Sequence, residues 1–351
     1  MSSPHTMWTN GRGDEGIMSR AKRAVWVVAS LAITLVIGQF SGVRDYASQL
    51  RNGDVTGVKE PEAVTTMAMA ALPDNALMQR LRTEAARQRR EPVDAKIDRV
   101  WKAIPGYNGL EVDLDATYRK AIASPDRPIQ YVYRQLAPKI HLNQLGNVPI
   151  YRGNPEKPMV SFMINVAWGN EFILPILNTL DQEKVKATFF LDGSWLKKNP
   201  DLAKEIQKRG HELSNHAYSH PNMSRLSRAR ATQEIEKTQV LLQETLGIKN
   251  NWFAPPSGDF NQQTVDIAAE CGLKTVLWTL DTVDWKHPSP ESVINKISSK
   301  VESGTLILMH PTDSSAAALK GMIHAIRSKG LVLGTVSQTL SPDRQLPAPV
   351  E

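Results

Sequence analysis

The sequence predicts an α/β fold with a parallel sheet, either closed into a barrel or strongly wound. Short apolar runs alternate with segments of helical periodicity through the C-terminal half of the chain, which is the pattern of strand–helix units. The 351 residues are 41% hydrophobic, enough for one large packed domain and a smaller unit. Parallel barrels carry their chemistry at the carboxyl ends of their strands. The predicted strand ends fall at Asn165, Asp192, Ala254 and His310.

The N-terminal segment has the layout of a signal anchor. Basic residues at positions 20, 22 and 23 precede the uncharged apolar run Ala24–Gly38. Fifteen helical residues span about 22 Å, short of the roughly 30 Å hydrocarbon core, so a crossing would extend to Val43. No clean Ala-x-Ala cleavage site follows. We therefore expect an uncleaved anchor with the N-terminus in the cytoplasm and the rest outside. A cleaved secretory signal and a buried core helix are the alternatives.

Residues between this anchor and the strand–helix region are less regular. The stretch 39–73 is polar with several Gly and Pro residues, typical of a tether, and residues 75–90 have helix-forming composition. Helical spacing of Ile97, Val100, Trp101 and Ile104 and a helical segment at 115–122 indicate a small α/β module. The predicted divisions are an anchor (1–43), a tether with helix (44–92), the module (93–155), the barrel (156–342) and a tail (343–351).

Within the barrel region each element rests on its own periodicity. Strands are expected at short strand-like runs, and helices where apolar residues recur every three or four positions. The predicted strands are 159–165, 187–191, 211–214, 252–254, 274–278 and 305–309, and the predicted helices are 171–184, 200–209, 226–246, 261–271, 290–301 and 315–329.

Charge and cysteine content exclude some functions. The net charge of +6 includes a cluster of arginines and lysines between Gln79 and Lys102, diluted by acidic residues. This cluster is either a solvated helix face or a surface attracted to anionic lipid or wall polymer. Nucleic acid is not an expected partner, because no aromatic stacking pattern accompanies the charge. The single cysteine, Cys271, excludes an internal disulfide and is expected to be a core residue.

Two histidines in the segment 210–221 are the most informative feature. His216 and His220 are four residues apart, a spacing that places two imidazoles on one helical turn, where their ring nitrogens can converge on one metal ion. By contrast, the strand at 159–165 ends in Asn165-Val166, without the carboxylates that such a site normally needs. The sequence therefore predicts a hydrolase scaffold with an incomplete site.

Several motifs together resemble the polysaccharide deacetylase (NodB-homology) family, and within it the sporulation-associated YlxY-like branch. They occur in the family's order and span residues 158–340. These motifs are Val160–Glu171, Ala187–Leu191, Gly210–Pro221, Ala254–Gly258, Asp281–Trp285 and Leu306–His310. The resemblance implies a distorted (β/α) barrel of roughly seven strands.

The resemblance also implies a reaction and a site. Family members remove an acetyl group from an N-acetylated sugar polymer, using a divalent metal, expected to be Zn²⁺, and acid–base residues. By this resemblance His216 and His220 are metal ligands, His310 is the general acid and Asp284 orients it. The residues expected to bind substrate are Trp285 and Leu308 around the acetyl methyl group, and Pro256 and Ser257. The backbone after Pro256, at Ser257-Gly258, is expected to supply the amide donor of an oxyanion hole.

Three positions depart from the family pattern. Asn165 and Val166 replace two aspartates, the base and a metal ligand, and Ala254 replaces an arginine that positions the base. An amide has no useful basicity, and an isopropyl group cannot bind a metal. Acidic residues that lie near the expected site, such as Asp192, Glu171 and Asp259, are candidate substitutes.

Two functions remain open. The first is a metal-dependent deacetylase with altered first-strand chemistry, acting on an N-acetylated cell-wall or spore polysaccharide such as peptidoglycan. The second is a catalytically weak or inactive pseudo-deacetylase that binds glycan or a sporulation partner. His310, Asp284 and the two histidines favour the first; the three replacements favour the second.

Overall fold

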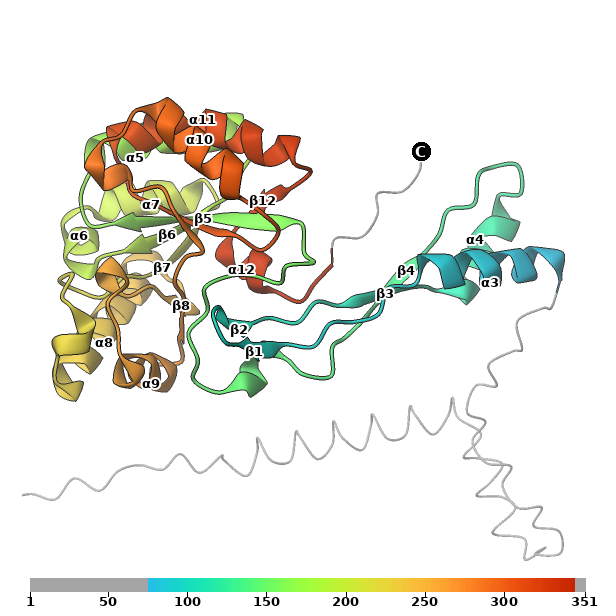
Figure 1. Cartoon of the computed structure of the whole chain (residues 1–351), viewed down its shortest axis with the longest axis horizontal. Coiled ribbons are helices and arrows are strands. Elements are labelled where there is room, and N and C mark those ends of the chain that lie inside the picture. The colour runs from blue at the N-terminus through green and yellow to red at the C-terminus, as the bar shows by residue number, and fades with distance from the viewer. Residues whose placement is uncertain (1–74, 345–351) are drawn as a thin grey trace, which may run out of the picture. The chain divides into compact units, whose positions relative to one another are not determined.

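The structure is a computed structural model that describes residues 75–344 (Figure 1). The membrane anchor predicted within 1–43 lies outside these residues, as does most of the predicted tail. Within 75–344, no helix has both the length and the apolar composition needed to cross a membrane.

One parallel sheet organises residues 159–340. Its strands follow the order β10-β11-β5-β6-β7-β8-β9, and β12 also pairs with β5, all in parallel. No pairing within the described part of the chain joins β10 to β9, so the sheet is a half-barrel, and the predicted distorted barrel is confirmed. The strands are β5 (Met159–Val166), β6 (Thr188–Leu191), β7 (Glu212–Asn215), β8 (Trp252–Phe253), β9 (Lys274–Thr275), β10 (Leu280–Asp281), β11 (Leu306–Met309) and β12 (Val332–Gly334).

Helices alternate with these strands. Every strand and helix predicted in the barrel region has a counterpart, whereas β10, β12, α6 and α12 were not predicted. The helices are α5 (Asn170–Gln182), α6 (Gly193–Lys198), α7 (Pro200–Lys208), α8 (Arg228–Leu246), α9 (Gln262–Glu270), α10 (Pro290–Lys300), α11 (Asp313–Ser328) and α12 (Val336–Leu340).

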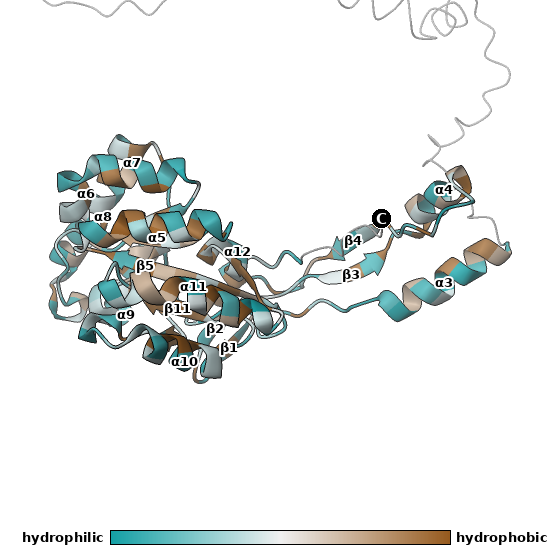
Figure 2. Cartoon of the chain, turned by 90° about the horizontal axis from the view of Figure 1, so that it is seen from above, coloured by the Kyte–Doolittle hydropathy of each residue, from teal (hydrophilic) through white to brown (hydrophobic). Residues whose placement is uncertain are grey.

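The central strand β5 separates two hydrophobic clusters. All eight of its residues are buried, as expected for a strand covered on both faces. Phe162, Ile164 and Val166 belong to the cluster between the sheet and helices such as α5 and α11, whereas Met163 packs in the barrel interior. Because side chains alternate along a strand, Asn165 lies on the interior face with Met163. Figure 2 shows the apolar tint of β5 beside helices that carry both polar and apolar residues.

Residues 75–136 form short elements with antiparallel pairing. Helix α3 packs on α4 and β3, and β3 pairs with β4. Their bounds are α3 (Ala76–Gln88), β1 (Lys96–Asp98), β2 (Lys102–Ile104), β3 (Gly109–Val112), α4 (Leu114–Ala123) and β4 (Tyr133–Leu136).

The helix suggested by the spacing of Ile97, Val100, Trp101 and Ile104 is wrong. The segment is a hairpin of β1 and β2. Asp98 Oδ1 accepts hydrogen bonds from the backbone N–H groups of Val100 and Trp101, each at 2.8 Å, which favours a turn over a helix. Ile97 and Val100 are more than half exposed, so the apolar spacing does not mark a buried helical face.

Candidate active site

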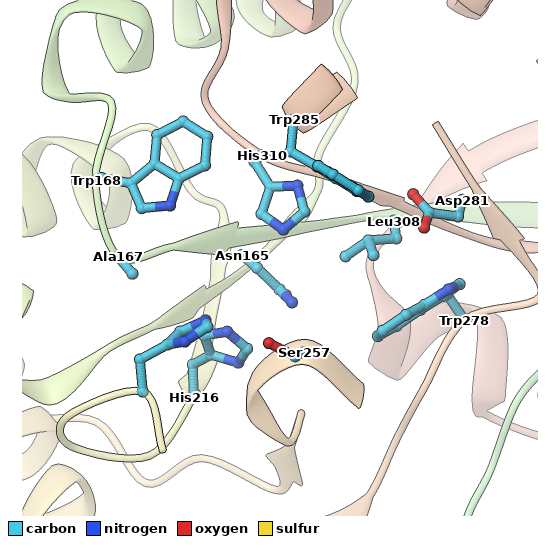
Figure 3. A pocket seen from close by; sticks show the side chains of 11 residues that line it. Asn165, Ala167, Trp168, His216, Ser257, Trp278, Asp281, Trp285, Leu308 and His310 are labelled. Atoms are coloured by element: carbon cyan, nitrogen blue, oxygen red, sulfur yellow. The ribbon is translucent and has the colours of Figure 1, made fainter. Parts of the chain in front are cut away.

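A cavity of about 430 Å³ opens at the carboxyl ends of the strands (Figure 3). It collects residues from β5, β10 and β11 and from the segments that follow β5, β7, β8, β9, β10 and β11, as in parallel barrels generally. The lining residues are Asn165, Ala167, Trp168, His216, His220, Ser257, Trp278, Asp281, Trp285, Leu308 and His310.

The two motif histidines both line this cavity, but not through a helix. They lie in the loop that follows β7, where Ala217 and His220 have positive φ angles of 60° and 56°. Glu234 of α8 fixes the loop by accepting hydrogen bonds from the backbone N–H groups of Tyr218 and Ser219. The imidazole centroids of His216 and His220 are 5.1 Å apart. The two imidazoles therefore lie next to each other in the cavity, but the helical turn expected to bring them together is wrong.

His216 is held as a neutral imidazole. Its side chain is buried, and its Nδ1 lies 2.7 Å from the carbonyl oxygen of Ala254. A carbonyl can only accept, so Nδ1 carries the proton and Nε2 keeps its lone pair. Burial, with a smaller contribution from His220, lowers the pKa of His216 to about 3. Ala254 thus contributes through its backbone, which fixes the ring orientation of His216.

His310 and Asp284 form the other half of the site. His310 follows β11, and Asp284 begins the short 3₁₀ helix η4 (Asp284–Lys286). Asp284 is fully buried and accepts hydrogen bonds from the backbone N–H and Nδ1 of His310 and from the hydroxyl of Ser315. Burial alone would raise the pKa of Asp284, but His310 and Ser315 outweigh it and hold this pKa below its usual value. The arrangement leaves His310 Nε2 available to the cavity.

The three altered positions differ in where their side chains lie. Asn165 is 3% exposed and lines the cavity, and no described residue donates a hydrogen bond to its Oδ1. Val166 is fully buried in the cluster between sheet and helices and does not line the cavity. Ala254 is also fully buried, in the barrel interior. Only Asn165 is thus positioned to contact a ligand directly.

The residues present do not fit a catalytic metal site. Zinc in such sites has three protein ligands. Here only the imidazoles of His216 and His220 are available, and the third ligand, a carboxylate, is missing. No group of three His, Cys, Asp or Glu side chains suited to a metal ion occurs within residues 75–344.

The candidate substitute carboxylates lie elsewhere. Asp192 Oδ1 caps α6 by accepting from the backbone N–H of Trp195 and the hydroxyl of Ser194, and Asp259 accepts from Ser224. Burial raises the pKa of Asp192 despite these hydrogen bonds, and its Oδ2 has no partner among the described residues. Glu171 is exposed in the first turn of α5. None of the three lines the cavity.

Sequence reasoning missed three lining residues, Ala167, Trp278 and Asp281, and included one residue, Pro256, that does not line the cavity. Trp278 lay in an apolar run assigned to a strand, and Asp281 belonged to a quoted motif in which only Asp284 and Trp285 were given roles. Asp281 is the only carboxylate among the described lining residues. Ser257 lines the cavity, whereas Pro256 is buried and does not line it. The Gly258 N–H bonds to the carbonyl of Pro255, so it is not free for an oxyanion.

Comparison with known proteins places these features in a family. The sequence profile of the polysaccharide deacetylase family matches residues 152–276. The uncharacterized protein YlxY of Bacillus subtilis is 45% identical over 294 residues, which cover 84% of this chain and 91% of YlxY. A peptidoglycan-N-acetylglucosamine deacetylase of Bacillus cereus is 35% identical over 165 residues, or 46% of this chain and 60% of that enzyme.

Among solved structures, a similar one is that of BA3943 from Bacillus anthracis, described as a CE4 family pseudoenzyme. It superposes with a TM-score of 0.73 and 39% identity, and the match covers 77% of this chain and 97% of BA3943. A mutant of BA3943 is described as having restored enzymatic activity.

Proposed function

Because this chain belongs to the polysaccharide deacetylase family, we propose that its cavity binds the N-acetyl group of a glycan but hydrolyses it poorly or not at all. The observation that carries this proposal is the position of Asn165, which lines the cavity and whose buried Oδ1 accepts no hydrogen bond from a described residue. A side-chain amide has both an acceptor and donors, the complement of an acetamide N–H and carbonyl. Leu308 and Trp285 line the same cavity and offer an apolar wall for the methyl group.

Asn165 also explains why hydrolysis fails. A general base must take a proton from water, and a carboxamide does not do so near neutral pH. Val166 supplies no metal ligand. The remaining acid, His310 with Asp284, can donate a proton to a leaving amine only after a nucleophile has attacked.

Slow hydrolysis is a second candidate function. It is favoured by the intact pair of His310 and Asp284 and by the carboxylate of Asp281, which lines the same cavity. In this alternative Asp281 acts as the base. The same glycan binds in both functions, and acetate release separates them.

Peptidoglycan or a related wall or spore polymer is the proposed ligand class, supported by the relatives named as peptidoglycan deacetylases. Deacetylases of this family generally depend on a metal. For this chain we propose only weak binding of an ion such as Zn²⁺ by His216 and His220. A sporulation setting, a membrane anchor within residues 24–43 and a barrel outside the cytoplasm belong to the same proposal, on the sequence evidence given above.

Isothermal titration tests the binding function. The full-length protein should bind an N-acetylglucosamine pentamer and should not bind its fully de-N-acetylated counterpart. Asn165→Leu keeps the size but removes the hydrogen bonds, so it should weaken binding about tenfold. Asn178→Leu, at an exposed position of α5 outside the cavity, is the control. Equal affinity for both oligomers, or full affinity in Asn165→Leu, would contradict the proposal.

A further inference from the structure

We propose that Trp168 forms a second sugar-binding subsite, which makes the cavity selective for a polymer over a single N-acetylated sugar. This inference rests on the proposed function and extends it from an N-acetyl group to a chain of sugars. Trp168 lies between β5 and α5, lines the cavity and is 44% exposed. An indole left this open at the edge of a cavity is not explained by core packing.

The position of Trp168 is fixed by its neighbours. Its ring is nearly parallel to that of His310, with an interplanar angle of 9° and a centroid separation of 5.9 Å. The next residue, Gly169, has a φ of 81°, and a Cβ there would come within 2.0 Å of the Pro311 carbonyl oxygen. The segment that contains Trp168 and Gly169 therefore packs closely against the segment that contains His310 and Pro311. A rigid aromatic side chain loses little conformational entropy when it binds a ligand.

A second exposed indole borders the same cavity. Trp285 is 51% exposed, and Lys286 Nζ lies 4.9 Å from its ring centroid. Figure 3 shows Trp168 on one side of His310 and Trp285 on the other. If the N-acetyl group enters beside Leu308 and Trp285, the sugar unit next along the glycan extends past His310 toward Trp168.

The chemistry of Trp168 matches a pyranose ring. One face of a hexopyranose presents C–H groups, which pack against the electron-rich face of an indole, while its hydroxyl groups remain in water. Trp168 offers an apolar indole surface, and the lining residue stacked beside it is His310. A monomer that occupies the N-acetyl subsite does not reach this surface, so the contribution of Trp168 appears only with longer oligomers.

Titration of the full-length protein with N-acetylglucosamine and with its pentamer tests the subsite. Trp168→Ala should weaken pentamer binding about tenfold and leave monomer binding within about twofold, whereas Trp168→Phe should keep most of the pentamer affinity. Leu174→Ala, on α5 with a similar exposed fraction of 43%, is the matched control and should bind both ligands as the unmodified protein does.

Each other outcome has a distinct meaning. Unchanged pentamer affinity in Trp168→Ala overturns the subsite. An equal loss for monomer and pentamer also overturns it, because Trp168 would then act on the N-acetyl subsite through His310. If the unmodified protein binds neither ligand, the proposed glycan-binding function fails, and the subsite fails with it.

Discussion

His310 Nδ1 lies 2.8 Å from Asp284 Oδ1, and the same carboxylate accepts the His310 backbone N–H at 2.6 Å. One buried acid therefore fixes both the ring and the main chain of the residue at the centre of the cavity. The pKa of Asp284 in the folded protein is below its ordinary value. The stabilising contribution of Asp284 is therefore present above its unfolded pKa of about 3.9 and is lost as pH falls through its folded pKa.

Asp284→Asn should consequently destabilise the protein at pH 7 by about 2 kcal/mol, because charge-assisted hydrogen bonds are replaced by neutral ones. The difference from the unmodified protein should shrink below about pH 4. Urea denaturation at pH 7 and pH 3 measures both values. A difference that stays the same at both values of pH would show that the charge of Asp284 is not the stabilising feature.

His211 gives a second pH dependence, away from the cavity. Its Nδ1 accepts the backbone N–H of Ala187, its Nε2 is buried without a partner among the described residues, and burial lowers its pKa to about 4. Between the unfolded pKa of about 6.5 and pH 4 the unfolded chain binds more protons, so stability falls as pH falls. His211→Asn, which retains an acceptor, should flatten this part of the stability curve. An unchanged slope in the variant would contradict the assignment.

Asp281→Asn tests the slow-hydrolysis alternative. If the unmodified protein releases traces of acetate, this variant should abolish the release while binding the N-acetylglucosamine pentamer with unchanged affinity. The control is Asp192→Asn, because Asp192 does not line the cavity and an asparagine there preserves the cap of α6. This variant should still release the trace of acetate. Acetate release that survives in Asp281→Asn would exclude Asp281 as the base.

Metal content after dialysis tests the two histidines. We expect substoichiometric Zn²⁺ in the unmodified protein and less in His216→Ala plus His220→Ala, since two neutral ligands without a carboxylate bind weakly. His324→Ala, an exposed histidine on α11, is the control. Equal metal in the unmodified and doubly substituted proteins would exclude a site at these histidines.

Much of the barrel was predictable because long strands and amphipathic helices have clear periods. The same reasoning failed at residues 96–104, where the local hydrogen bonds of Asp98 determine a hairpin that apolar spacing cannot reveal. In the site, His216, His220 and His310 were predictable from motifs. Trp278 and Asp281 were not, since whether a residue faces a cavity or a core depends on packing between distant segments. Likewise the inward direction of Asn165 and the outward direction of Val166 follow from the sheet.

The structure also sets a condition for repairing the site. Val166 and Ala254 are fully buried, so introducing a charge at either one alone is expected to cost stability without completing the site. Asn165→Asp alone supplies a base but leaves any metal poorly held. The three substitutions Asn165→Asp, Val166→Asp and Ala254→Arg must therefore be combined, and the folded fraction of the variant verified before activity is compared.

Acetate release from an N-acetylglucosamine pentamer, measured for the unmodified protein and the triple variant with added Zn²⁺ or Co²⁺, tests the central claim most directly. The unmodified protein should release little or none. The folded triple variant should release acetate faster by a factor of at least about 10²–10⁴, and His310→Ala in that background should remove the gain. Robust release by the unmodified protein would contradict the claim that Asn165, Val166 and Ala254 disable hydrolysis.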